Sequence, residues 1–132
     1  MSFPHWNASL ELGVPEIDTD HQHLIGLLRK LTDLSQGDCD RDEIWSVLMD
    51  LEDYTHQHFA REEQLMADIQ HEFFRQHKAE HDQLKLDVRN TIDDFLADKV
   101  GIKEILNFLQ RWLIVHISGS DTLLAKELRQ RR

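Results

Sequence analysis

The segment that decides the fold runs from residue 54 to residue 66 and reads Tyr54-Thr55-His56-Gln57-His58-Phe59-Ala60-Arg61-Glu62-Glu63-Gln64-Leu65-Met66. On a helix, His58 and Glu62 share one face with the apolar positions, whereas Glu63 lies about 100° further round. A histidine and a glutamate therefore interrupt the stripe that a helix buries against its neighbours. Burying these two groups is favourable only if polar partners from other helices meet them.

Turn-forming residues divide the 132-residue chain into helical segments. The apolar pattern is interrupted near residues 13–15, 37, 99–101 and 118–120, and it changes phase between residues 68 and 71. We expect an N-terminal arm over 1–17, helices over 18–36, 41–68, 71–97 and 102–117, and a short helix over about 121–130. Asp18 is expected to begin the first helix, and Asp40 with Glu43 resembles a capping box for the second.

Four helices joined by short loops pack most simply as an up-down-up-down antiparallel bundle. The expected fold class is therefore all-α, an up-down-up-down four-helix bundle with a short C-terminal helix. A chain of this length forms one hydrophobic core, so we assign residues 1–132 to a single domain.

The buried face of every predicted helix contains gaps filled by histidine or glutamate. The apolar stripe of the third helix, for example, is Phe73, Leu84, Val88, Ile92 and Phe95. Across the four helices the gaps are occupied by His21, His58, Glu62, His77, His81 and His116. In the alternating topology these positions fall within roughly 15 Å of one end of the bundle. Burying them without partners would cost on the order of several kcal/mol, and a metal ion satisfies them together.

Asp121 is the seventh residue that we expect in this metal site. It follows His116 by five residues, which would leave the two side chains about 140° apart on a continuous helix. Ser118-Gly119-Ser120 is expected to break the helix, with Ser120 as the cap of the next one, and the break makes ligation by Asp121 feasible.

The remaining histidines lie off the buried faces, and we expect them to be solvated: His5, His23, His56 and His71. We likewise expect Arg61 and Glu63 to lie mainly on the outer face of the second helix.

Composition argues against several other functions. The net charge of −10 would repel nucleic acid and anionic membrane surfaces, and no apolar run approaches the length of about 18 residues that spans a membrane. The N-terminus lacks the basic start and apolar run of a signal peptide, so we expect a cytoplasmic protein, and we expect a monomer. Cys39 is the only cysteine, which excludes an internal disulfide, and we assign it no role.

Four motifs contain all seven polar residues of the predicted site: Ile17-Asp18-Thr19-Asp20-His21-Gln22-His23-Leu24, His58-Phe59-Ala60-Arg61-Glu62-Glu63-Gln64-Leu65-Met66, His77-Lys78-Ala79-Glu80-His81 and His116-Ile117-Ser118-Gly119-Ser120-Asp121. In these motifs, and in Trp6 and Trp112-Leu113, the chain resembles the hemerythrins, specifically the single-domain bacteriohemerythrins. The resemblance extends over nearly the whole chain.

This resemblance implies two non-haem irons with a bridging oxide or hydroxide. His77, His81 and His116 would bind one iron and His21 and His58 the other, with Glu62 and Asp121 bridging both. This ligand set leaves one position open on the iron with two histidines. Dioxygen would bind there reversibly, end-on, as a hydroperoxide. The neighbouring residues Leu24, Phe59, Trp112, Leu113 and Ile117 would form the walls of the oxygen pocket.

The function implied is therefore an oxygen carrier, storage or delivery protein and not an enzyme. The abundance of histidine and the small number of carboxylates favour this interpretation over a di-iron oxidase or peroxidase, as does the absence of a spare inward acid. A second alternative is a module that senses oxygen or iron through a partner protein, which the sequence does not identify. A third is a bundle that binds zinc or no metal.

Overall fold

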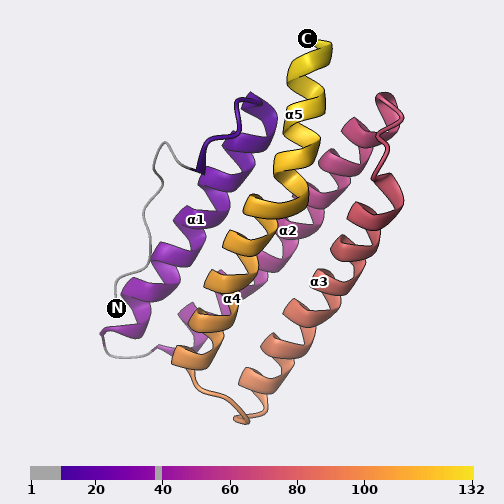
Figure 1. Ribbon diagram of the computed structural model, residues 1–132. Helices are drawn as coiled ribbons and strands as arrows, with labels where there is room; N and C mark the ends of the chain where they lie inside the picture. Colours follow the sequence, from indigo (N-terminus) through magenta and orange to yellow (C-terminus); the bar gives the residue numbers. More distant parts are fainter. Residues whose placement is uncertain (1–9, 38–39) are drawn as a thin grey trace.

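The computed structural model describes residues 10–37 and 40–132. Its elements are α1 (Pro15–Ser35), α2 (Arg41–Asp68), α3 (Phe74–Leu96), α4 (Ile102–His116), a π-helical turn η2 (Ile117–Asp121) and α5 (Thr122–Arg131). Helix α1 packs against α2 and α4, and α3 packs against the same two helices. Figure 1 shows these four helices alternating in direction, with α5 continuing beyond the end of α4. The expected all-α four-helix bundle with a short C-terminal helix is confirmed.

Helix α1 begins at Pro15, three residues before the predicted start, so the prediction for Asp18 was wrong. Proline suits the first helical position because it has no N–H group to leave unpaired. The carboxylate of Asp18 instead accepts hydrogen bonds from the backbone N–H groups of Leu12, at 2.8 Å, and Gly13, at 3.0 Å. Gly13 has a φ of +81°, which favours glycine. Asp18 thus fixes the turn that leads into the helix.

Helix α2 begins after Asp40, whose carboxylate accepts from the backbone N–H groups of Asp42 and Glu43, which confirms the Asp40 half of the predicted capping box. It is followed by a turn in which Gln70 has a φ of +52°. Helix α3 then begins at Phe74, three residues later than expected.

The late start of α3 overturns one prediction for the core. Phe73 lies before the helix and is 38% exposed, so it does not belong to the buried stripe. Phe74, the first residue of α3, packs instead, partly buried, against a small apolar cluster beneath α5.

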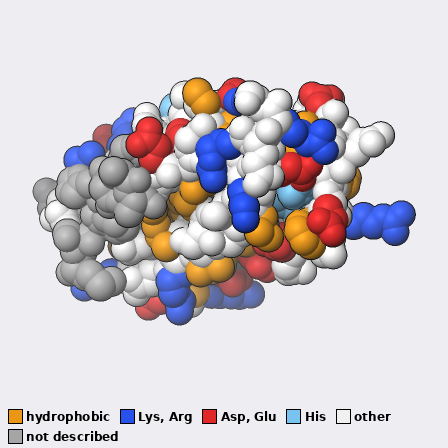
Figure 2. Space-filling model, turned by 45° about the horizontal axis from the view of Figure 1, so that its top comes forward, with side chains coloured by type: hydrophobic (Ala, Val, Ile, Leu, Met, Phe, Trp, Pro, Cys, Tyr) orange, Lys and Arg blue, Asp and Glu red, His pale blue; other side chains and the backbone are white. Residues whose placement is uncertain are grey.

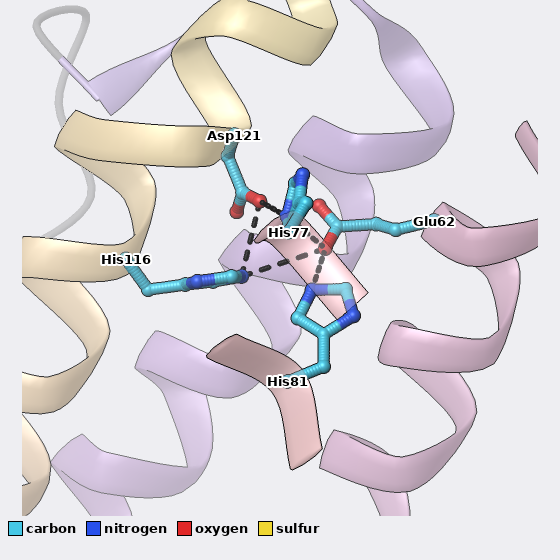
Figure 3. Close-up of side chains that lie close together, drawn as sticks. All are labelled: Glu62, His77, His81, His116 and Asp121. Atoms are coloured by element: carbon cyan, nitrogen blue, oxygen red, sulfur yellow. Dashed lines mark hydrogen bonds and ion pairs between the residues drawn. The ribbon is translucent and has the colours of Figure 1, made fainter. Parts of the chain in front are cut away.

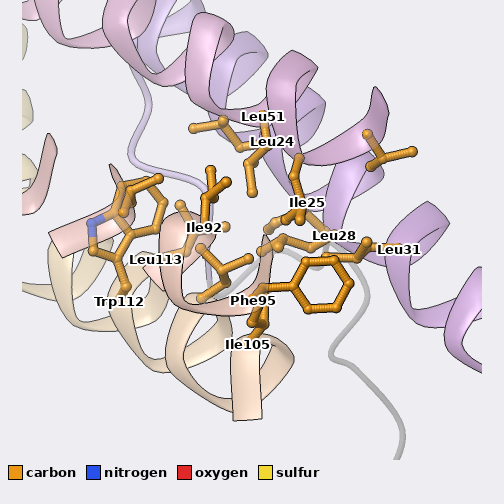
Figure 4. Packing of buried hydrophobic residues seen from close by; sticks show 14 of the residues in the cluster. Leu24, Ile25, Leu28, Leu31, Leu51, Ile92, Phe95, Ile105, Trp112 and Leu113 are labelled. Carbon is orange, nitrogen blue, oxygen red and sulfur yellow. The ribbon is translucent and has the colours of Figure 1, made fainter. Parts of the chain in front are cut away.

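The apolar core has two parts. The larger part fills the bundle and includes Leu24, Trp112 and Leu113 (Figure 4). Phe59 and Ile117 also belong to it. The smaller part packs under α5 and consists of Val14, Ile17, Met66, Leu124, Ala125 and Leu128. Along α1, α2 and η2, the polar residues of the predicted site lie in the sequence between members of the larger cluster and members of the smaller one. A polar layer is thus enclosed by apolar packing on both sides.

The described surface carries charged residues together with several exposed apolar side chains, such as Val115 and Leu86. Figure 2 shows charged side chains of both signs over one face of the molecule, with little histidine surface among them. Among the described residues, none of the helices has the length and apolar character needed to cross a membrane.

Candidate metal centre

The structure brings all seven predicted ligands together in the polar layer. Their nitrogen and oxygen atoms form two groups that overlap, and the ligand atoms within each group lie within 4.8 Å of one another. The first group contains Glu62, His77, His81, His116 and Asp121, which converge in Figure 3, and the second contains His21, His58, Glu62 and Asp121. Every one of these residues is at most 3% exposed.

The two carboxylates belong to both groups, and each directs one oxygen toward each group. Glu62 Oε1 lies 2.9 Å from His81 Nε2, whereas its Oε2 lies 3.4 Å from His58 Nε2. Asp121 Oδ1 lies 3.0 Å from the Nε2 atom of His77, and its Oδ2 lies 2.8 Å from His21 Nε2. This is the arrangement needed for two carboxylates that bridge a pair of metal ions.

The π-helical turn η2 positions Asp121. Gly119 has non-helical angles, with φ −101° and ψ −106°, so the expected break is present. Asp121 Oδ1 consequently lies 3.0 Å from His116 Nε2 although five residues separate them. The expected capping role of Ser120 was wrong, because its hydroxyl donates to Glu80 of α3 and no side chain of the described residues caps the N-terminus of α5. Single π turns inside helices are frequent at functional sites.

Several contacts in the cluster bring acceptor atoms face to face. His58 donates its Nδ1–H to Asp20 at 2.8 Å, so whenever the ring is neutral its Nε2 presents a lone pair to Glu62 Oε2. Neither atom has a hydrogen-bond partner among the described residues. His81 likewise donates its Nδ1–H to Glu63, and its Nε2 is close to Glu62 Oε1 but not aligned for a hydrogen bond. A cation between such acceptors, either a proton or a metal ion, relieves their repulsion, and this set of nitrogen and oxygen atoms fits a metal pair.

The electrostatics of the cluster also favour cations. Burial and the charge of Asp121 both raise the pKa of Glu62, but His58, His116 and His77 outweigh them and hold it well below its ordinary value. Burial alone would lower the pKa of His77, yet its contacts with Asp121 and Glu62 raise it to about 9. The same balance raises the pKa of His116 to about 10. In the absence of metal, the two carboxylates would hold protons on these rings.

Two acidic residues outside the seven support the histidines, and sequence reasoning missed both. Asp20 is 5% exposed and bonds to His58, and its other partners include Arg61. Glu63, whose side chain is 20% exposed, accepts from His81 Nδ1 at 2.9 Å. Arg61 is exposed over 42% of its side chain, as predicted, although it also bonds to Asp20. The prediction that Glu63 lies mainly on the outer face was wrong. The available signal was the position of each acid directly beside a predicted ligand in the sequence.

The other histidines divide into three cases. His23 and His56 are exposed, as predicted, and His23 stacks on the ring of Tyr54 with centroids 3.9 Å apart. The prediction for His71 was wrong, because it is 5% exposed and its Nδ1 contacts Glu127 of α5. The predictions for His5, Trp6 and Cys39 lie outside the described residues.

All five predicted pocket residues are buried in the larger part of the core: Leu24, Phe59, Trp112, Leu113 and Ile117. Phe59 contacts the site directly, because its ring stacks on His81 with centroids 3.9 Å apart and planes inclined by 7°. A groove of about 350 Å³ between α3 and α4 reaches Trp112 and His116 from the surface.

The bundle and the cluster define a class: helical-bundle proteins with a potential metal-binding site of buried histidines and carboxylates. A family model described as the hemerythrin HHE cation binding domain matches residues 12–128. The chain therefore belongs to the hemerythrin family.

Relatives and solved structures agree with this assignment. A bacteriohemerythrin of Pseudomonas aeruginosa strain LESB58 is 34% identical over 116 residues, covering 88% of this chain and 75% of that protein. One from Clostridium acetobutylicum is 32% identical, covering 88% of this chain and 94% of the relative. A crystal structure of wild-type hemerythrin superposes with a TM-score of 0.84 at 30% identity, covering 93% of this chain and 95% of that one.

Proposed function

We propose that this protein binds dioxygen reversibly at a pair of non-haem iron ions. One observation carries the proposal: Glu62 and Asp121 each present one oxygen to a group with three histidines and the other oxygen to a group with two. A pair of metal ions held in this way has unequal ligand sets, so the ion with fewer histidines has room for an additional ligand.

The proposed ligands are those that the resemblance implied. His77, His81 and His116 would hold one iron, His21 and His58 the other, and Glu62 and Asp121 would bridge them together with oxide or hydroxide. The iron pair supplies electrons for the reversible binding of dioxygen. The end-on mode of binding that the resemblance implies remains part of this proposal.

The protein itself contributes a dry, enclosed environment. Leu24, Phe59 and Leu113 have no exposed surface, and we propose that they wall the oxygen pocket with Trp112 and Ile117. Exclusion of water and free protons limits irreversible oxidation.

Asp20 is a buried acid near the site, contrary to the sequence-based expectation. It lies on the Nδ1 side of His58, and hydrogen bonds from His58, Arg61 and Tyr54 occupy its oxygens. This arrangement supports a carrier over an oxidase or peroxidase.

Sensing through a partner protein remains the alternative of a different class, and an oxygen-dependent partner would favour it. A monomeric state and a cytoplasmic location also remain part of the proposal.

The deciding experiment is anaerobic reduction of iron-loaded protein followed by an oxygen titration monitored by visible absorption. We expect a charge-transfer band that disappears under vacuum and returns with oxygen. Prompt irreversible oxidation with turnover of a substrate would favour an enzyme instead.

Two histidines of α2 provide a matched pair of substitutions. His58→Ala removes a ring from the buried cluster and is expected to lower the iron content from about two per chain to about one or less. His56→Ala changes an exposed ring and should leave about two irons bound. Metal analysis of both variants, expressed in iron-replete cells, tests the expectation. Equal iron loss in the two variants would mean that the assignment of the buried face is wrong.

Iron loading should depend on pH through the histidines with raised pKa values. Because the pKa of His77 is raised to about 9 and that of His116 to about 10, iron has to displace protons from these rings at neutral pH. The apparent affinity for Fe²⁺ should rise with pH from 6 to 8, by roughly tenfold per unit for each proton displaced. Anaerobic competition with a chromophoric chelator measures this slope. An affinity independent of pH would contradict the expectation.

A further inference from the structure

We propose that Asp20 and Arg61 form an ion pair that sets the electron-donating strength of His58 and, through it, the reduction potential of the iron with two histidines. Asp20 and Arg61 are thus positioning residues that act through His58. The inference rests on the proposed function, because it concerns the iron that His21 and His58 would hold.

The carboxylate of Asp20 accepts hydrogen bonds from three side chains of α2. Its Oδ2 accepts from His58 Nδ1 at 2.8 Å and from Arg61 Nε at 2.8 Å. Its Oδ1 accepts from Arg61 at 2.7 Å and from the Tyr54 hydroxyl at 2.8 Å. The side chain of Asp20 is only 7% exposed, whereas that of Arg61 is 42% exposed. The ion pair thus joins Arg61, a partly solvated cation, to Asp20, a buried anion that is hydrogen-bonded to His58.

A carboxylate that accepts from the outer nitrogen of a metal-bound histidine fixes the tautomer and strengthens the ring as a donor. A negative charge beside His58 stabilises the more oxidised metal, because the interior screens charge weakly. Arg61 opposes this effect by neutralising part of the charge of Asp20. Asp20 and Arg61 therefore have opposite effects on the electron-donating strength of His58.

The arrangement is confined to one ring of the two-histidine group. The Nδ1 atom of His21 is buried and has no hydrogen-bond partner among the described residues, so His58 alone connects this group to an outer carboxylate there. In the three-histidine group, His81 has Glu63 as its partner, but no bond or ion pair joins Glu63 to an arginine in the described part of the chain. A change in the charge of Asp20 or Arg61 should therefore affect the two-histidine iron first.

The test uses the opposite charges of the two residues. Asp20→Asn keeps an acceptor for His58 but removes the negative charge, so the midpoint potential of the iron pair should rise. Arg61→Leu leaves Asp20 without its counter-charge, so the potential should fall. Arg61→Lys keeps a positive charge at this position, so its midpoint potential should lie close to that of the unaltered protein. A merely structural role would not give shifts of opposite sign. Midpoint potentials are measured by anaerobic titration with a chemical reductant, and iron content is determined in the same samples.

Two controls complete the design. Tyr54→Phe removes one hydrogen bond to Asp20 without changing any charge, and Arg89→Leu removes a surface cation that pairs with Glu52 and Asp93 elsewhere on the bundle. Both should shift the potential less than Arg61→Leu. Asp20→Ala removes charge and hydrogen bond together and should weaken iron binding by about tenfold or more.

The outcomes separate this inference from the proposed function. If the unaltered protein binds about two irons but the shifts of Asp20→Asn and Arg61→Leu have the same sign or are absent, the inference fails and the proposed function stands. If the unaltered protein binds no iron, the proposed function itself fails. If Asp20→Asn does not load iron, the comparison of Arg61→Leu with Arg61→Lys decides: equal potentials in those two variants overturn the inference.

Discussion

Replacing Glu62 with alanine is expected to abolish paired metal binding and lower the iron content from about two per chain to below about one. Glu62 is 1% exposed, and its two oxygens approach histidines of both groups: His81 and His116 on one side and His58 on the other. Its removal takes one ligand from each proposed iron and leaves Asp121 as the one carboxylate of the seven residues that is shared by both groups. Of all substitutions in the chain, we expect this one to have the largest effect on metal binding.

The adjacent Glu63 gives the matched control. Glu63→Ala removes the same functional group from a partly exposed position, whose one hydrogen bond within the described part of the chain is to the outer nitrogen of His81. It should retain about two irons, bound more weakly. Metal analysis after extensive dialysis distinguishes the two variants. Retention of two irons by Glu62→Ala would exclude this carboxylate as the bridge.

Phe59→Ala is expected to have the largest effect on stability, lowering the free energy of unfolding by about 3–5 kcal/mol. Phe59 has no exposed surface and lies in the larger part of the core. Its ring stacks on His81 and lies 5.7 Å, between centroids, from that of His58 and 5.2 Å from that of His116. The substitution leaves a cavity directly against the metal centre, because the helices on either side cannot collapse to fill it.

Chemical denaturation of the iron-loaded protein measures this loss. Phe73→Ala, at a ring that is 38% exposed, is the control and should cost less than about 1 kcal/mol. We also expect Phe59→Ala to shorten the lifetime of the oxygenated protein, because water can enter the cavity. A cost for Phe59→Ala no greater than that for Phe73→Ala would contradict the assignment of Phe59 to the wall of the site.

The fold was predictable because apolar periodicity depends only on local sequence. Each stripe identified a helix and its buried face, and the polar gaps in the stripes identified the six residues that the structure collects in one layer. The sequence showed only that ligation by Asp121 was feasible. The direction of its side chain relative to His116 depends on the π-helical turn at Gly119. Spacing alone does not specify the angle at which a broken helix continues.

The supporting residues were not predictable in the same way. Helical phase directs Arg61 and Glu63 away from the buried face, but their long side chains reach back along the seams between helices. Their partners, Asp20 and His81, lie on other helices, so the contacts depend on the packing of the bundle. His71 was missed for a similar reason: α5 covers it with Glu127, more than 50 residues away in sequence.

The most direct test of the central claim is a crystal structure of the iron-loaded protein with anomalous diffraction measured at the iron absorption edge. We expect two anomalous peaks inside the bundle, one beside His77, His81 and His116 and one beside His21 and His58. Glu62 and Asp121 should each contact both peaks. A single peak, or two peaks that do not share these carboxylates, would contradict a bridged iron pair.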